Sequence, residues 1–125
     1  MQRNDWKTIL VVEDEEIVRQ FALTVLRQAG YRTLEAFNGQ TGLASFVRHR
    51  SEVDLILTDV VMPHSGSEMA EAILHVEPSM KIVFMSGTAG FASFPDQLKR
   101  FPMLQKPFTP ESLLRTIRGA FSEQP

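Results

Sequence analysis

Residues 9–14 read Ile-Leu-Val-Val-Glu-Asp, an unbroken apolar run that ends abruptly in two acids. A strand without polar alternation is typical of a parallel sheet, because helices cover both faces of such a sheet. The arrangement returns at 55–57, with Asp59 two residues later, and at 82–85, followed by Ser86. The pattern predicts buried parallel strands that each deliver a polar side chain near the carboxyl end.

Apolar residues at helical spacing separate these strands. Between Glu15 and Ala29 they fall on one face of a predicted helix, and Gly30 follows as a stop signal. Asn38-Gly39 and Thr109-Pro110-Glu111 are typical of helix starts. With the remaining patterns they predict five helices that alternate with five strands, the strands lying at 9–12, 33–36, 55–57, 82–85 and 103–105.

The stretch after Ser86 has the least regular pattern. Gly87, Gly90 and Pro95 weaken any continuous helix over 88–100, so the fourth helix is predicted to be short or broken. Five strands alternating with helices nevertheless predict right-handed crossovers and a doubly wound α/β sheet.

Length and composition limit the functions that a protein of this fold could have. The 125 residues, 43% of them hydrophobic, suffice for one core, so we expect a single domain over 1–125. Without cysteine there can be no disulfide and no thiolate metal site. A net charge of -2 without a basic stripe argues against direct nucleic-acid binding. The polar start and the lack of a long apolar run argue against a membrane partner and favour a cytoplasmic location.

The strand-end residues form the candidate site, because ligands of such sheets bind beyond the carboxyl ends, where the strand order reverses. Grouped carboxylates there attract a hard divalent cation, and Glu13, Asp14 and Asp59 supply the oxygens that Mg²⁺ prefers. Asp59 could then attack a phosphoryl donor and form an acyl phosphate. Ser86 and Lys106, which follow the fourth and fifth strands, could bind the phosphoryl oxygens. We also expect Asp14 to cap the first helix.

Four short motifs occur in order: VVEDEE at 11–16, DVVMP at 59–63, MSG at 85–87 and KPFTPE at 106–111. Through them the chain resembles a response-regulator receiver domain of bacterial two-component signalling, from about residue 7 to residue 121. The resemblance implies a flavodoxin-like, three-layer αβα fold whose five parallel strands lie in the order 2-1-3-4-5.

The resemblance also implies a role for each strand-end residue. Asp59 would be the phosphoacceptor, and Ser86 and Lys106 the switch hydroxyl and the phosphate-sensing amine. Glu13, Asp14 and Asp59, with the backbone carbonyl of Val61, would hold Mg²⁺. A cis peptide bond is implied between Lys106 and the proline that follows it.

Partners are implied in the same way. The donor would be a phosphohistidine on a sensor histidine kinase or on a histidine phosphotransfer protein. The output would pass to an unknown downstream protein, with a homodimer left open, or the chain would be part of a longer protein, since 106–118 resembles the end of receivers in hybrid kinases. We expect no turnover enzyme, only self-phosphorylation and slow autodephosphorylation, because apolar Val61 stands where relatives often carry a polar side chain.

Two departures from the family pattern bear on signalling. Met103 stands where most receivers have Tyr or Phe, the ring that usually moves with the switch hydroxyl. Phe101 could replace that ring or could serve packing alone. The segment His64-Ser65-Gly66-Ser67 is one residue shorter than usual, which predicts a reshaped loop beside Asp59.

Three alternatives remain to be weighed. A Mg²⁺-dependent phosphohydrolase of the haloacid dehalogenase type also uses an Asp nucleophile, but it needs a second acid where Val61 stands. A nucleotide-binding domain would carry a glycine-rich loop after the first strand, where the acidic pair stands instead. A receiver-like interaction module that is never phosphorylated would not need the complete set of site residues.

Overall fold

The computed structural model describes residues 7–62, 66–87 and 94–122. The elements are β1 (Thr8–Val12), α1 (Glu16–Gln28), β2 (Arg32–Ala36), α2 (Gly39–Arg48), β3 (Leu55–Asp59), α3 (Gly66–Val76), β4 (Lys81–Ser86), the 3₁₀ helix η3 (Asp96–Leu98), β5 (Met103–Gln105) and α4 (Pro110–Ser122). All strand pairs are parallel, and the order is β2-β1-β3-β4-β5. The flavodoxin-like sheet that the sequence predicts is therefore confirmed.

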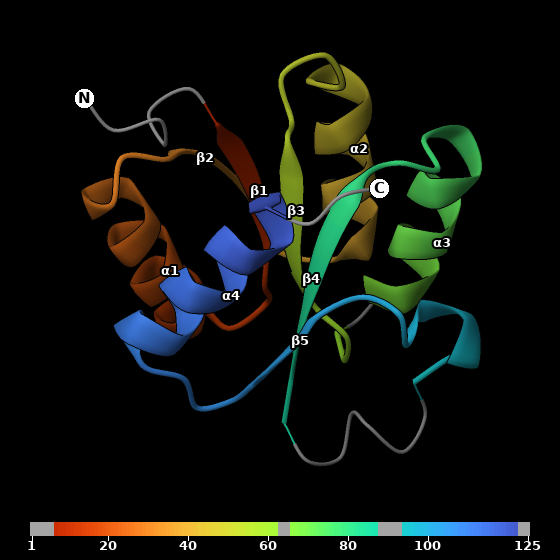
Figure 1. The fold of residues 1–125 in the computed structure, drawn as a ribbon. Coiled ribbons are helices and arrows are strands. Elements are labelled where there is room, and N and C mark those ends of the chain that lie inside the picture. The colour runs from red at the N-terminus through yellow and green to blue at the C-terminus, as the bar shows by residue number, and fades with distance from the viewer. Residues whose placement is uncertain (1–6, 63–65, 88–93, 123–125) are drawn as a thin grey trace.

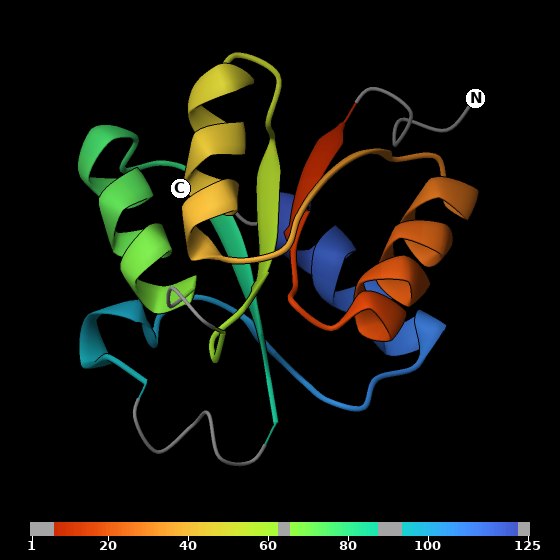
Figure 2. The same ribbon diagram turned by 180° about the vertical axis from the view of Figure 1, so that it is seen from behind.

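The sheet is the middle layer of three, with α1 and α4 on one face and α2 and α3 on the other (Figures 1 and 2). Side chains of β1 alternate between the two cores. Ile9 and Val11 pack with α1 and α4, whereas Leu10 and Val12 pack with α2 and α3. Since every residue of β1 is buried, the unbroken apolar run follows directly from its central position.

Local signals at most helix ends behave as predicted. The Thr41 N–H donates to Asn38 Oδ1 at 2.8 Å at the start of α2. The Ser112 N–H donates to Thr109 Oγ1 at 3.0 Å at the start of α4. After α1 the chain turns at Gly30, whose φ of 99° is a left-handed conformation that glycine adopts without a steric penalty.

The prediction for Asp14 as a helix cap is wrong. The N-cap of α1 is Glu15, and its side chain makes no capping hydrogen bond. Instead the Glu13 carboxylate reaches forward, and its Oε2 accepts the Glu15 N–H at 3.0 Å. Glu13 therefore supplies the acceptor at this helix start, which leaves the exposed Asp14 side chain available to the site.

Four α-helices are present in the described residues, and the fourth of the five predicted helices, expected to be short or broken, is represented there by the 3₁₀ turn η3 between β4 and β5. Gly90 lies outside the described residues. Phe94 and Leu98 are buried against the core on the α2 and α3 face. The Phe94 ring meets the Phe84 ring edge-on, with centroids 4.9 Å apart. In residues 94–100, the described part of this stretch, the chain forms only this short turn, in agreement with a short or broken element.

Phe101 and Met103 lie beside this aromatic group. The Phe101 ring meets the Phe84 ring edge-on at 6.0 Å, and Met103 pairs with Phe84 in the register of β4 and β5. Both side chains are partly buried against the same core, which favours packing as the role of Phe101. The shortened loop is only partly visible, since His64 and Ser65 lie outside the described residues and α3 begins at Gly66. None of the helices in the described segments is long and apolar enough to cross a membrane.

Candidate functional site

The strand order reverses between β1 and β3, and the acidic residues gather at the carboxyl ends of these two neighbours. Asp59 ends β3 and Glu13 follows β1 directly, in a register that pairs Val12 with Thr58. Carboxylate oxygens of Glu13, Asp14 and Asp59 lie within 4.8 Å of one another. Glu13 and Asp59 are buried, and Asp14 is exposed. The three acids predicted to hold a metal therefore share one place in the fold, beyond the carboxyl ends of β1 and β3, which point downward in Figure 1.

The amine of Lys106, the residue that follows β5, lies in the same cluster. Lys106 Nζ lies 2.5 Å from Asp59 Oδ2 and 2.8 Å from Glu13 Oε1. It also lies 3.5 Å from an oxygen of the exposed Glu15. The peptide bond between Lys106 and Pro107 is cis, as the resemblance to receiver domains implied. The single ammonium thus pairs with two buried carboxylates at once.

The two remaining candidates, Ser86 and Val61, border the cluster. Ser86 ends β4 and is buried, and its hydroxyl donates to the Gly87 carbonyl at 2.7 Å. Its own carbonyl accepts the Lys106 N–H at 2.9 Å, which ties the ends of β4 and β5 together. The Val61 N–H donates to Asp59 Oδ1 at 3.0 Å, while the Val61 side chain is exposed. Main-chain contacts therefore place both residues beside Asp59 and Lys106.

Comparison with known proteins shows the family to which the chain belongs. A family model described as the response regulator receiver domain matches residues 9–118. The chain belongs to the response-regulator receiver family. The receiver is 35% identical over 115 residues to the response regulator receiver protein CpdR of Brucella abortus (strain 2308), a match that covers 89% of this chain and 93% of CpdR.

A second relative is far longer than this chain. The receiver is 33% identical over 120 residues to the sensor kinase CckA of Brucella abortus (strain 2308), which covers 94% of this chain but 13% of the kinase. Among solved structures, a response regulator receiver domain protein from Clostridium thermocellum superposes with a TM-score of 0.83 at 27% identity, covering 91% of this chain and 93% of that one. Similar receivers therefore occur both as small proteins and as parts of long kinases.

The ionisation of the receiver's cluster is set by burial and by Lys106. Burial raises the pKa of Glu13 to about 7, and repulsion from Asp59 adds to the effect, while hydrogen bonds from Lys106 and the Glu15 N–H oppose it. Burial alone would lower the pKa of Lys106. The hydrogen bonds to Asp59 and Glu13 outweigh burial and hold that pKa above its usual range.

The chemistry of the cluster fits Mg²⁺. Three carboxylates offer hard oxygen ligands, and the buried Glu13 Oε1 has the Lys106 ammonium as its partner at 2.8 Å. A divalent cation that binds here would meet one flexible lysine, whose long side chain can withdraw. The acidic cluster could therefore bind a divalent cation in place of the Lys106 ammonium.

The affinity for Mg²⁺ is expected to rise with pH up to about 7, because the metal must displace the proton from Glu13 below that pH. The dissociation constant should fall by up to about tenfold per pH unit as pH approaches 7 and level off above it. Calorimetric titration with MgCl₂ at several pH values measures this. Glu13→Gln should weaken binding and flatten its pH dependence, and an unchanged slope in that variant would assign the titration to another group.

One residue of the site was not predicted from the sequence. Gly66, the first residue of α3, packs so closely that an added Cβ would lie 1.9 Å from the Asp59 carbonyl oxygen and 2.9 Å from Thr58 Oγ1. The start of α3 thus packs directly on the backbone of Asp59. A glycine that opens a helix close to a strand end is the signal that could have indicated this contact.

Proposed function

We propose that this receiver accepts a phosphoryl group on Asp59 from a phosphohistidine of a sensor histidine kinase or a histidine phosphotransfer protein, with Mg²⁺ present, and passes the signal to a downstream protein by a conformational change. The observation that carries this proposal is the Asp59 carboxylate, buried between two further carboxylates and a lysine amine 2.5 Å away. We also propose that residues 7–121 make up the receiver core.

The reaction is a transfer between two nucleophiles. An Asp59 carboxylate oxygen attacks phosphorus, the phosphorus–nitrogen bond to the donor histidine breaks, and the imidazole leaves with the electron pair and takes up a proton. Glu13, Asp14, Asp59 and the Val61 carbonyl would hold Mg²⁺, which would neutralise charge on the phosphoryl oxygens. Lys106 already lies against Asp59 Oδ2, so its amine has only to follow a phosphoryl oxygen bound at that position. Ser86 would bind another of these oxygens.

Acetyl phosphate, a small-molecule phosphoryl donor, tests this proposal without a kinase. With Mg²⁺ the wild-type chain should gain the mass of one phosphoryl group, as measured by intact-mass spectrometry, and with excess EDTA it should gain none. Asp59→Asn should remain unmodified, whereas Asp96→Asn, which removes an exposed carboxylate on η3, should behave as wild type. The same gain in Asp59→Asn would refute the assignment, and no gain in the wild type would favour an interaction module that is not phosphorylated.

A function as a phosphohydrolase has less support than a function as a phosphoacceptor or as an interaction module. Position 61 holds an exposed valine, and its backbone N–H is used to orient Asp59. Without a second acid at this position the leaving group lacks a proton donor. We therefore propose a signalling domain that phosphorylates itself from a donor and hydrolyses the product slowly.

The donor protein is proposed to dock on an apolar surface beside the site. A groove of about 490 Å³ is lined by apolar side chains of α1 and of the segment after β5, with Lys106 at its rim, the apolar residues being Ile17, Val18, Phe21, Pro107 and Phe108. The rings of Phe21 and Phe108 lie 5.9 Å apart, and Ile17 is 86% exposed. Because a donor must bring its histidine to Asp59, a helix of the donor can pack in this groove while its phosphohistidine reaches the site.

Replacing Ile17 by serine is expected to slow transfer from a phosphohistidine donor about tenfold, because contact with the exposed apolar side chain is lost. Phosphorylation by acetyl phosphate should be unchanged, since that donor needs no docking. Val47→Ser, at another exposed apolar residue, which lies on α2, is the matched control and should leave both reactions unchanged. Equal loss with acetyl phosphate, or no loss with the protein donor, would rule out docking at Ile17.

A further inference from the structure

The loop between β1 and α1 carries two of the proposed Mg²⁺ ligands and is held by its main chain. The Glu13 N–H donates to the Ala36 carbonyl of β2 at 3.1 Å. The Glu13 carbonyl accepts a hydrogen bond from Arg19 Nη1 at 2.9 Å. This carbonyl belongs to the peptide unit that joins Glu13 to Asp14, and the peptide unit is planar. Its orientation therefore helps to set the directions in which both carboxylates leave the backbone.

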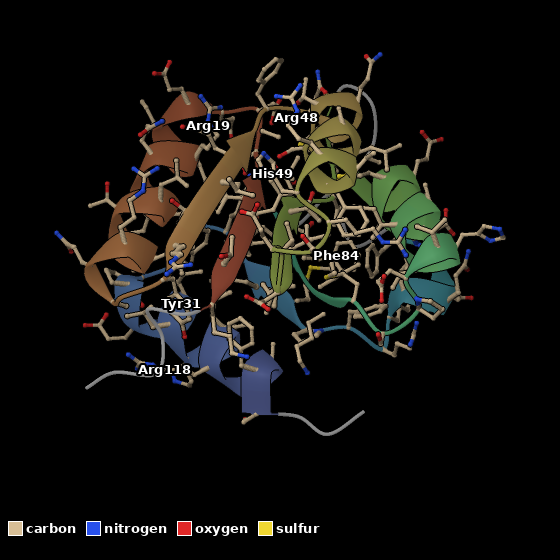
Figure 3. The ribbon with its side chains drawn as sticks, turned by 90° about the horizontal axis from the view of Figure 1, so that it is seen from above. Arg19, Tyr31, Arg48, His49, Phe84 and Arg118 are labelled. Atoms are coloured by element: carbon tan, nitrogen blue, oxygen red, sulfur yellow. The ribbon has the colours of Figure 1, made fainter. Side chains whose placement is uncertain are left out.

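Arg19 is itself fixed by a partner on a different strand. Its Nε donates to Glu35 Oε1 at 3.0 Å, and its side chain is only 15% exposed. Gln20 Nε2 reaches the same Glu35 oxygen at 3.4 Å. Figure 3 shows Arg19 on α1, on the side toward β2. The guanidinium thus spans the gap between the carboxylate of β2 and the carbonyl of the ligand-bearing loop with two different nitrogens of its planar fork, whereas a lysine ammonium would have to reach both acceptors from one nitrogen.

We infer that Arg19 is a positioning residue for the metal site, holding the Glu13–Asp14 peptide unit in the orientation that lets both carboxylates face one cation. The inference rests on the proposed function, because it takes Mg²⁺ as the cation. The Arg19 charge is paired with Glu35, which limits its repulsion of a metal ion. Contacts behind the ligands commonly change metal affinity by a factor of ~10 or more, because they fix the ligand geometry before the metal arrives.

A second arginine of α1 provides a matched control. Arg27 Nε donates to Thr33 Oγ1 at 2.7 Å, so Arg27 also joins α1 to β2, but about two helical turns beyond Arg19 and farther from the acidic loop. If Arg19 only fastened the helix to the sheet, the loss of either arginine would have the same consequence. If Arg19 positions the acidic pair, only its own loss should weaken metal binding.

Isothermal titration with MgCl₂ tests the inference on the wild-type chain and on Arg19→Gln, Arg19→Lys and Arg27→Gln, with thermal unfolding to verify that each variant is folded. Arg19→Gln should bind Mg²⁺ ~10-fold more weakly, and Arg19→Lys should also lose affinity although it keeps the charge. Arg27→Gln should bind as wild type. With acetyl phosphate, Arg19→Gln should need more Mg²⁺ for half-maximal phosphorylation but reach the wild-type rate at saturation.

A double variant separates Arg19 from its partner. Because Glu35 acts through Arg19, Arg19→Gln combined with Glu35→Gln should cost no more Mg²⁺ affinity than Arg19→Gln alone. Equal or tighter binding in Arg19→Gln would overturn the inference and leave the proposed function intact, as would equal weakening in Arg27→Gln. A wild-type chain that binds no Mg²⁺ would overturn both.

Discussion

Replacing Lys106 by methionine is expected to lower the free energy of unfolding by about 3 kcal/mol at pH 8 in the absence of divalent cations. The Lys106 ammonium lies 2.5 Å from Asp59 and 2.8 Å from Glu13, and both carboxylates are buried. Methionine fills a similar volume but leaves the two carboxylates facing each other without a cation. In the variant Glu13 can take up a proton, but its carboxyl group lacks the partner that Lys106 provides in the wild type.

Added Mg²⁺ should restore most of this stability, because it binds the folded chain and replaces the missing positive charge. The loss should also be smaller at pH 5, since an acid whose pKa is raised on folding stabilises the protein at low pH and loses that contribution as pH rises to about 7. Urea unfolding with and without MgCl₂ measures both effects. Lys99→Met, which breaks the exposed pair with Asp96, should leave the free energy of unfolding nearly unchanged. Equal losses in the two variants, or no response to Mg²⁺, would contradict an ion-pair role for Lys106.

Gly66→Ala is expected to destabilise the fold by about 3 kcal/mol and to slow phosphorylation of Asp59. The added Cβ would lie 1.9 Å from the Asp59 carbonyl oxygen, which is backbone and cannot rotate away. Either the start of α3 or the end of β3 must then move, at the cost typical of an overpacked core. Movement of β3 would also displace the Asp59 carboxylate from Lys106 and from the other two acids.

Gly119→Ala is the matched control for this substitution. A Cβ at Gly119 meets nothing within 4 Å, and the residue lies inside α4, so alanine should stabilise the helix by up to about 1 kcal/mol. Urea denaturation of both variants gives the comparison. If Gly66→Ala were as stable as wild type and were phosphorylated at the same rate, the close packing of α3 on Asp59 would be refuted.

The fold could be predicted because local patterns and packing agree along most of the chain. The Ile9–Val12 run has no polar alternation, and its side chains do enter two separate cores. Carboxyl-end positions for Glu13, Asp59 and Ser86 follow from the strand assignments alone, since parallel strands end at one edge. The sequence alone therefore predicts that these three residues lie at the same edge of the sheet.

The parts that could not be predicted depend on contacts between distant segments. No local sequence signal indicates that Glu13 Oε2 accepts the N–H of Glu15, the N-cap of α1, or that Asp14 does not cap this helix. The clamp of Arg19 on the Glu13 carbonyl depends on where α1 lies against β2. In the described residues between β4 and β5, Phe94 packs on Phe84, and helix propensity contains no information on such a ring contact.

Chemical location of the phosphoryl group tests the central claim most directly. The wild-type chain is phosphorylated by acetyl phosphate with Mg²⁺ and reduced with sodium borohydride, which converts an aspartyl phosphate to homoserine, and its peptides are then sequenced by tandem mass spectrometry. We predict homoserine at position 59 and an unmodified acid at positions 13 and 14. A reduced product at position 14 with intact Asp59, or a phosphoryl group that resists reduction and lies on a hydroxyl such as that of Ser86, would contradict it.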